Sequence, residues 1–168
     1  MTDAAIRIRN FDAETDLDGI RACIVELQEH ERNIYQRLPP ADAVVDECVR
    51  YMLEQCDKSD GCILVFEDDV GIGGFVTILN RVISEEPDDG EFEYGLISDL
   101  VVLQRCRGNT VGRQLMIAAE NHARENSVEW LRVGVIAGNR VAEHLYQSLG
   151  FSPWHIDLEK QLGDQKKT

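Results

Sequence analysis

The chain has 168 residues, of which 43% are hydrophobic and 29% are charged. This length and composition predict one globular domain with a buried core and exclude a disordered chain. The net charge of −14 argues against a nucleic-acid partner, because a polyanion would be repelled, and slightly favours a cationic partner.

The sequence contains no apolar run long enough to span a membrane, and its first residues lack the pattern of a signal peptide. We therefore expect a cytoplasmic protein without a membrane partner. Five cysteines, an odd number without a CxxC pair, predict free thiols, and the four histidines share no metal-ligand spacing. We expect no metal site. Cys106 has basic neighbours, which favour a lowered pKa of its thiol, but no partner base for a nucleophilic role is evident.

The first part of the chain predicts an edge strand, two helices and three further strands. Alternating apolar residues indicate the strands, and apolar residues at helical spacing indicate the helices, with Thr15 or Asp16 as the first N-cap. A break at Pro39-Pro40 separates the helices. The elements are predicted, in chain order, at Ile6–Phe11, Asp12–Glu31, Ala41–Cys56, Cys62–Glu67, Ile72–Ser84 and Phe92–Leu103.

The second part predicts a long helix, a strand, a short helix and a last strand. They are expected at Val111–Asn126, at Trp130–Val135, between Asn139 and Gly150, and at Phe151–Glu159. The short helix has Asn139 as a good N-cap and Gly150 in the position of the C′ residue. Its apolar face is formed by Ala142, Leu145, Tyr146 and Leu149.

The turn between Leu103 and the long helix has the features of an anion-binding site. N–H groups at a helix start have no intrahelical partner, and the helix dipole adds partial positive charge there. Gly108 and Gly112 allow a ligand close to the main chain, and Arg105, Arg107 and Arg113 add full charges. The turn therefore predicts a phosphate or pyrophosphate site, although a basic loop that merely caps a helix explains this motif alone equally well. Neither a dinucleotide fingerprint nor a P-loop is present.

Two motifs together resemble the GNAT superfamily of N-acetyltransferases. The acyl-CoA signature of that family, Gln/Arg-x-x-Gly-x-Gly/Ala, corresponds to Arg107, Thr110 and Gly112, with Thr110 in place of the middle glycine. Because threonine has a Cβ and resists positive φ, we expect ordinary dihedral angles at Thr110. The second motif, Asn-x-x-Ala-x-x-x-Tyr-x-x-x-Gly-Phe, corresponds to residues 139–151.

The resemblance implies an α/β (α+β) fold over a single domain, residues 1–168. It implies a mixed, mostly antiparallel sheet that is splayed between its fourth and fifth strands and flanked by about four helices. Acetyl-CoA would enter the gap, without a metal, and an acetyl group would pass directly to a primary amine of a small molecule or peptide in a ternary complex. The implied cofactor-binding residues are Leu100, Val101, Val102, Arg107, Gly108, Asn109, Thr110, Val111, Gly112, Arg113, Asn139, Ala142 and Tyr146.

The same resemblance implies that Tyr146 is the general acid, since a phenol is protonated at neutral pH and can donate to a leaving thiolate. Packing alone would also explain a tyrosine on an apolar helix face. No base is assigned, because Leu96 occupies the position where relatives often carry a carboxylate. Strand alternation puts Leu96 on the face opposite Asp99, but a bulge between them, common in this family's strand, would exchange the faces. Asp99 is interpreted as structural.

Water-relayed proton loss through Tyr94, Ser98 or Glu93 is one alternative for the base, and an acceptor that arrives already deprotonated is another. A CoA-binding regulatory or interaction module without transfer activity is the alternative function, motivated by Thr110 and Leu96. A structural α/β domain without a nucleotide ligand ranks last, since it requires both motifs to be coincidental. Homodimers are common in the family, but no segment of this chain demands one, and no residue pattern identifies the acceptor.

Overall fold

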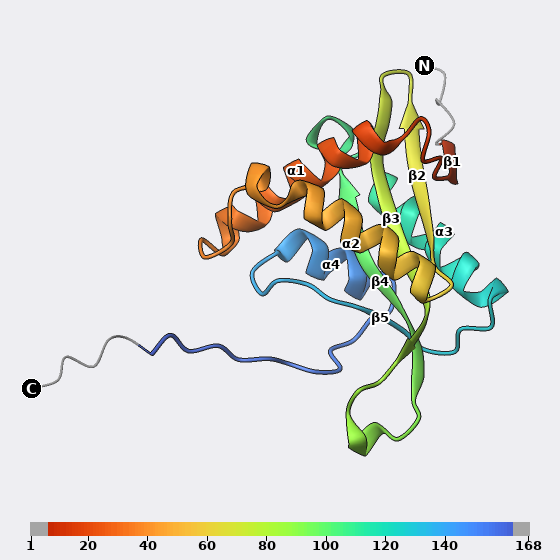
Figure 1. Ribbon diagram of the computed structural model, residues 1–168, viewed down its shortest axis with the longest axis vertical. Coiled ribbons are helices and arrows are strands. Elements are labelled where there is room, and N and C mark those ends of the chain that lie inside the picture. Colours follow the sequence, from red (N-terminus) through yellow and green to blue (C-terminus); the bar gives the residue numbers. More distant parts are fainter. Residues whose placement is uncertain (1–6, 163–168) are drawn as a thin grey trace, which may run out of the picture.

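The computed structural model describes residues 7–162 and contains a five-stranded sheet flanked by four α-helices (Figure 1). The strand order is β1-β2-β3-β4-β5, and all neighbours are antiparallel except β4 and β5, which are parallel. The predicted mixed, mostly antiparallel α/β fold is thereby confirmed. The elements are β1 (Arg7–Asn10), α1 (Leu17–Ile34), α2 (Val45–Lys58), β2 (Cys62–Asp68), β3 (Gly71–Ile83), β4 (Glu93–Val102), α3 (Val111–Glu125), β5 (Leu131–Val133) and α4 (Arg140–Ser148).

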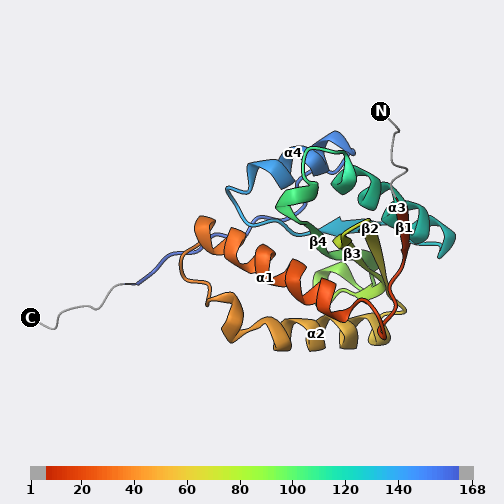
Figure 2. The same ribbon diagram turned by 90° about the horizontal axis from the view of Figure 1, so that it is seen from above.

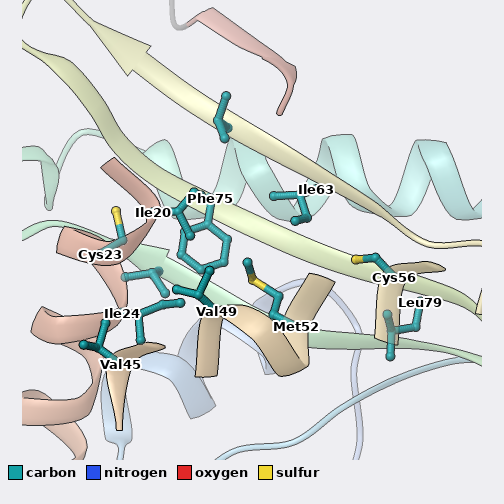
Figure 3. Packing of buried hydrophobic residues seen from close by; sticks show 12 residues of the cluster. Ile20, Cys23, Ile24, Val45, Val49, Met52, Cys56, Ile63, Phe75 and Leu79 are labelled. Carbon is teal, nitrogen blue, oxygen red and sulfur yellow. The ribbon is translucent and has the colours of Figure 1, made fainter. Parts of the chain in front are cut away.

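The helices form two layers, with α1 and α2 on one face of the sheet and α3 and α4 on the other (Figure 2). Phe75 of β3 packs with Ile20 and Met52 on the first face (Figure 3). Ile78 of the same strand packs with Leu115 on the second face. Burying such a side chain contributes about 1.5–3 kcal/mol, so β3 is apolar on both faces because both are covered.

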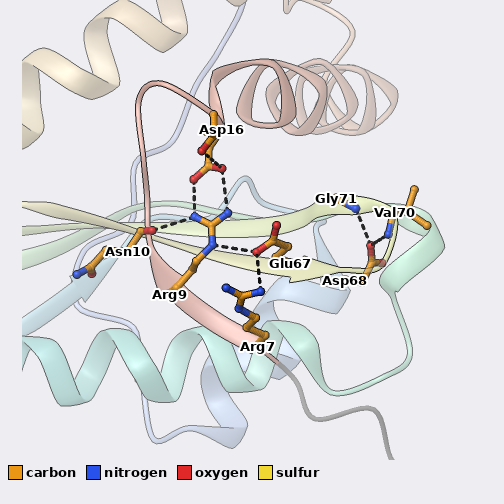
Figure 4. Close-up of polar contacts among 9 residues, drawn as sticks. Arg7, Arg9, Asn10, Asp16, Glu67, Asp68, Val70 and Gly71 are labelled. Atoms are coloured by element: carbon orange, nitrogen blue, oxygen red, sulfur yellow. Dashed lines mark hydrogen bonds and ion pairs between the residues drawn. The ribbon is translucent and has the colours of Figure 1, made fainter.

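The connection between β1 and α1 is held by an ion-pair network (Figure 4). Arg9 Nη1 and Nη2 lie 2.6 and 2.9 Å from the two carboxylate oxygens of Asp16, and Arg9 Nε lies 2.9 Å from Glu67 Oε2. The helix begins after Asp16, as predicted, but this side chain does not cap it. The carboxylate of Asp16 instead accepts hydrogen bonds from Arg9 and from the N–H of Asp12. Only 2% of Asp16 is exposed, so its negative charge requires a positively charged partner.

A bulge in β4 decides which side chains share a face. Ile78 pairs with Ile97 and Thr77 with Asp99, so Ser98 has no partner across the ladder. Leu96 and Asp99 therefore lie on the same face of the sheet, the one covered by α1 and α2. From the sequence, Leu96 and Asp99 were expected to share a face only if a bulge lay between them, and the structure contains that bulge.

The parallel pairing of β4 with β5 is short. It covers only Gly95–Ile97 of β4 and the three residues of β5. Residues 98–102 of β4 continue past the end of this ladder, so β5 does not pair with their outer edge.

Several predicted element bounds require correction. The helix predicted from Ala41 begins at Val45, because residues 41–43 form a separate 3₁₀ turn. The strand predicted over Trp130–Val135 is reduced to β5. Ile6, placed at the start of the first strand, lies outside the described residues.

The prediction of a last strand at Phe151–Glu159 is wrong. Residues 152–162 form no strand, are exposed throughout, and run away from the sheet (Figure 1). Alternation of apolar residues makes a strand only where a sheet edge offers hydrogen bonds, and this segment leaves the body without meeting one.

None of the described helices combines the length and apolarity needed to cross a lipid bilayer.

Candidate active site

The turn after β4 leads into α3 through two residues with left-handed backbone. Gly108 has φ of +80°, which glycine adopts freely. Thr110, the residue before the helix, has φ of +60° and ψ of 2°. The expectation of ordinary dihedral angles at Thr110 is therefore wrong: the turn imposes the geometry of the family's glycine, and the threonine carries the strain.

Main-chain donors gather at the start of α3. The first main-chain hydrogen bond of α3 runs from Gln114 N–H to the carbonyl oxygen of the N-cap residue Thr110, at 3.0 Å. Within residues 7–162, the N–H groups of Val111, Gly112 and Arg113 have no acceptor, and the side chain of Thr110 does not cap them. Together with the helix dipole, these donors form the predicted anion-binding geometry.

The arginines of the turn are held by the protein itself. Arg105 pairs with Asp68 and donates to Ile72 O at 3.0 Å. Arg107 donates from Nε to Val102 O at 2.8 Å and from Nη2 to Glu26 at 3.0 Å. These bonds fix the turn against β4 and α1, and they balance part of its positive charge.

Arg113 differs from the other two arginines, because its contact is with a neutral group. Its Nη1 donates to Ser148 Oγ at 2.9 Å, which ties α3 to the end of α4. Its full charge at the first turn of α3 remains available to a phosphate.

Cys106 is buried, with 4% of its surface exposed, and its pKa is raised by burial and by the neighbouring Asp68. The expected lowering by basic neighbours is thus wrong, because the thiol points into the core while Arg105 is bound to Asp68. A glycine at 73 leaves the space that the Cys106 sulfur needs. Cys106 is a packing residue.

The outer edge of β4 presents main-chain groups to the gap in the sheet. Leu103 N–H donates to Gly73 O at 2.9 Å, toward β3. Because successive N–H groups of a strand point to opposite edges, those of Leu100 and Val102 point away from β3, toward the gap. An extended ligand lying in the gap would find these donors in line with the start of α3.

Helix α4 has the predicted caps. Asn139 Oδ1 accepts from Ala142 N–H at 3.3 Å, which confirms the N-cap. At the other end Gly150 has φ of +92°, Gly150 N–H donates to Gln147 O, and Phe151 N–H donates to Tyr146 O. This is a Schellman motif, and its accompanying apolar contact joins the rings of Phe151 and Tyr146, whose centroids lie 6.1 Å apart.

Tyr146 lies on α4, with 8% of its surface exposed. Burial, together with the charges of Glu31 and Asp99, raises the pKa of its phenol to about 12. The phenol is therefore protonated at neutral pH.

Two carboxylates, Asp99 and Glu31, have raised pKa values. Burial raises the pKa of Asp99, and the Ser98 hydroxyl, which donates to Asp99 Oδ2 at 2.7 Å, offsets only part of the effect. Burial and the charge of Asp99 raise the pKa of Glu31. Thr77, opposite Asp99 across the ladder, is fully buried.

Sequence reasoning missed these groups for different reasons. Asp99 is a lone carboxylate in the apolar run from Leu96 to Leu103, which could have marked it as a candidate site residue. The sequence alone did not show the bulge, so the face on which Asp99 lies could not be predicted. Glu31 gave no signal, because its proximity to Asp99 comes from packing between segments far apart in the chain.

The main groove lies elsewhere. A groove of roughly 780 Å³ runs beside β5, lined among others by Phe92, Trp130 and Trp154, and it includes neither Tyr146 nor the turn before α3. Trp154 stacks there on the guanidinium of Arg132. Among residues 7–162, no three histidine, cysteine or acidic side chains lie close enough together to hold a metal ion.

Known proteins resemble this chain in sequence and in fold. Over 114 residues it is 28% identical to a mycothiol acetyltransferase of Nocardiopsis dassonvillei, a match covering 68% of this chain and 34% of that protein. The chain thus spans about a third of the length of this relative. Its fold is similar to that of glucosamine-6-phosphate N-acetyltransferase from Arabidopsis thaliana, with a TM-score of 0.64, 18% identity, and coverage of 94% and 99% of the two chains.

A second solved structure, the PH1933 protein from Pyrococcus horikoshii OT3, has a TM-score of 0.73 at 18% identity and covers 90% of this chain and 92% of its own. The model of the acetyltransferase (GNAT) family matches residues 24–151. Those residues contain the turn before α3, the open edge of β4 and the capped helix that carries Tyr146, and the chain belongs to the acetyltransferase (GNAT) family.

Proposed function

We propose that this protein transfers an acetyl group from acetyl-CoA to a primary amine of a small molecule or peptide, directly and in a ternary complex. The observations that support the proposal are the unpaired donors at the start of α3, the outer edge of β4 beyond its ladder with β5, and Tyr146, whose phenol is protonated at neutral pH. The parent family supplies acyl transfer as the general chemistry.

The binding residues divide between two parts of the coenzyme. The N–H groups of residues 111–113 and the charge of Arg113 suit the diphosphate, and the space around Gly108, where an added Cβ would meet nothing within 4 Å, suits close approach. The edge N–H groups of Leu100 and Val102 suit the extended pantetheine amides and the thioester oxygen. Arg107 positions the turn through Val102 and Glu26.

The raised pKa values of Asp99 and Tyr146 support the following proton transfers. The amine nitrogen forms a bond to the thioester carbonyl carbon and gives one proton to the Asp99 carboxylate. The carbon–sulfur bond breaks, and the departing thiolate takes the proton of Tyr146. Asp99 then returns its proton to the phenolate, directly or through water, so that both residues end as they began.

Replacement of Tyr146 by phenylalanine tests the general acid. We expect Tyr146→Phe to lower kcat about 10²–10³-fold with little change in the KM for acetyl-CoA, since the phenol acts on the leaving group and not on binding. Thiol release from acetyl-CoA is measured over a panel of polyamines, amino acids, aminoglycosides and basic peptides. Tyr51→Phe is the matched control, because Tyr51 is 60% exposed on α2. Unchanged turnover in Tyr146→Phe would remove the assignment.

Calorimetric titration with acetyl-CoA separates transfer from binding alone. We expect saturable binding that weakens in Arg113→Ala, because the diphosphate loses a charged donor. Binding without turnover on any acceptor would favour the CoA-binding module, the alternative suggested by Thr110 and Leu96. Absence of binding at millimolar acetyl-CoA would contradict both functions.

A further inference from the structure

Arg132 of β5 lies among three aromatic rings. Its Cζ is 5.0 Å from the ring centre of Phe92, 4.1 Å from that of Tyr94 and 4.7 Å from that of Trp154. Contacts at these distances are cation–π interactions, which hold a guanidinium in place without using its N–H groups. Only 23% of the side chain is exposed, so the rings fix a positive charge in a mostly buried position.

The N–H groups of this guanidinium donate no hydrogen bond within residues 7–162. Its ion pair in that part of the chain is with Asp89, whose Oδ2 lies 3.8 Å from Arg132 Nη2, too far for a hydrogen bond. A guanidinium presents its donors as a planar fork, which matches the two oxygens of a carboxylate. Arg132 also lines the groove of roughly 780 Å³, so a ligand in the groove can reach these unused donors.

The strand register relates Arg132 to the proposed reaction centre. Arg132 pairs with Leu96 across the parallel ladder, so the two side chains lie on the same face of the sheet. Tyr94 shares this face by alternation, and the bulge at Ser98 places Asp99 there as well. Positions 96 and 99 are about 10 Å apart along the strand, at roughly 3.3 Å per residue. A ligand of about that length can therefore contact Asp99 at one end and Arg132 at the other.

The charges around Arg132 select the kind of ligand. The groove is also lined by carboxylates, which belong to Asp88, Asp89, Glu120 and Glu129. These groups repel an anion that has no positive charge of its own, and they repel a doubly charged phosphate more strongly than a carboxylate. A zwitterion with a single carboxylate avoids most of this repulsion, because its amine is attracted by the same groups that repel its carboxylate.

We propose that Arg132 binds a carboxylate of the acceptor, so that the acceptor is an amino acid or a short peptide whose reactive amine lies several bonds from that carboxylate. Arg132 would determine specificity without touching the reacting atoms, and Phe92 and Tyr94 position its guanidinium. The inference rests on the proposed function, because it takes Asp99 as the group that receives the proton of the amine.

The test compares thiol release from acetyl-CoA with 6-aminohexanoate and with hexylamine, which share one chain length and differ in the carboxylate. We expect kcat/KM to favour 6-aminohexanoate by a factor on the order of 10–100, the effect of one charged hydrogen-bonded pair. Arg132→Gln should raise the KM for 6-aminohexanoate by a similar factor, with little change in kcat, and should leave hexylamine turnover unchanged. β-Alanine and propylamine, which are too short to reach both residues, should not differ.

Arg124→Gln is the matched control. Arg124 lines the same groove but pairs with Glu120 on α3, so this variant should keep the preference for 6-aminohexanoate. Equal kcat/KM values for 6-aminohexanoate and hexylamine in the unaltered chain would overturn the proposal. An Arg132→Gln variant that loses activity equally on both amines would also overturn it, because it would show a structural role for Arg132.

Calorimetric titration with N-acetyl-6-aminohexanoate, the product of the transfer, tests the carboxylate site without turnover. We expect binding in the presence of CoA that is weakened in Arg132→Gln and unchanged in Arg124→Gln. If this binding is seen but no amine is acetylated, the proposed function fails and the carboxylate site at Arg132 stands. Binding that is absent or independent of Arg132 overturns the site, and acetylation of hexylamine would then leave the proposed function intact.

Discussion

Thr110 keeps a backbone conformation that its side chain disfavours. Its left-handed φ of +60° is the geometry in which a Cβ crowds the backbone, and its hydroxyl makes no cap bond that would compensate. The cost persists because the bonds of Arg107 and the packing of Cys106 fix the turn on both sides. The contacts that fix the turn therefore outweigh the backbone preference of Thr110.

Replacement of Thr110 by glycine should stabilise the protein by about 0.5–1 kcal/mol. Relief of roughly 1–2 kcal/mol of strain exceeds the extra entropy that glycine gives to the unfolded chain. The free energy of unfolding is measured by denaturant titration. Thr110→Ala serves as the control, because it keeps the Cβ and hence the strain, and a glycine variant no more stable than the alanine variant would contradict the interpretation.

Asp99 should link activity and stability to pH in opposite directions. Its pKa is raised in the folded state, so folding favours the protonated form. The group therefore supports folding at low pH, and this contribution is lost as the pH rises past the unfolded value and through the folded one.

Asp99→Asn is accordingly expected to stabilise the protein at pH 8, to have little effect at pH 3, and to lower kcat about 10²-fold. Unfolding free energies at the two pH values, beside turnover, measure this. Asp88→Asn, on an exposed turn, is the control and should change neither quantity. A variant that is destabilised at pH 8 would show that Asp99 is a structural carboxylate.

At the scale of elements, a single bulge reorganises β4. Without the unpaired Ser98, Leu96 and Asp99 would lie on opposite faces, and no carboxylate of this strand would reach the face covered by α1. The short ladder with β5 then leaves the next residues of the strand free along one edge. The bulge therefore sets the face on which Asp99 lies, and the short ladder leaves main-chain donors of β4 unpaired along its outer edge.

The corner between β1 and α1 depends on the ion pair of Arg9 and Asp16. Arg9 lowers the pKa of Asp16 from 3.8 to about 2, which corresponds to about 2 kcal/mol of stability at neutral pH. Because the pKa is depressed in the folded state, this contribution is present above pH 4 and is lost as the pH falls toward 2.

Asp16→Asn should therefore lose about 2 kcal/mol of unfolding free energy at pH 7, with a difference from the unaltered chain that shrinks between pH 4 and pH 2. Urea titrations across this range provide the measurement. Asp46→Asn breaks the exposed pair with Arg21, in which Asp46 is 79% exposed, and should cost less than about 1 kcal/mol at any pH. Equal effects of the two variants would contradict a special role for the buried pair.

At the scale of the whole molecule, the net charge of −14 favours the approach of a positively charged acceptor. If the acceptor is an ammonium compound, attraction over distances beyond about 8–10 Å is screened as salt is added. We expect kcat/KM to fall with ionic strength for a polyamine and to stay constant for an uncharged amine analogue, measured in the same thiol-release assay. A polyamine rate that ignores salt would show that the charge serves solubility alone.

The sequence by itself determined the order of the elements, both caps of α4 and the donor-rich start of α3. These features depend on local physics: the spacing of apolar residues, the asparagine and glycine that end a helix, and the unpaired N–H groups of any first turn. The site of Tyr146 followed from the same spacing, through the resemblance to the family.

Only the tertiary structure decided the rest. The left-handed Thr110, the buried thiol of Cys106 and the raised pKa of Glu31, to which the charge of Asp99 contributes, each depend on segments distant in the chain. Local preference does not include these contacts, and packing energy exceeds it at each position. Residues 152–162 have the pattern of a strand, but a strand forms only where it pairs with an edge, and these residues do not pair with the free edge of β5.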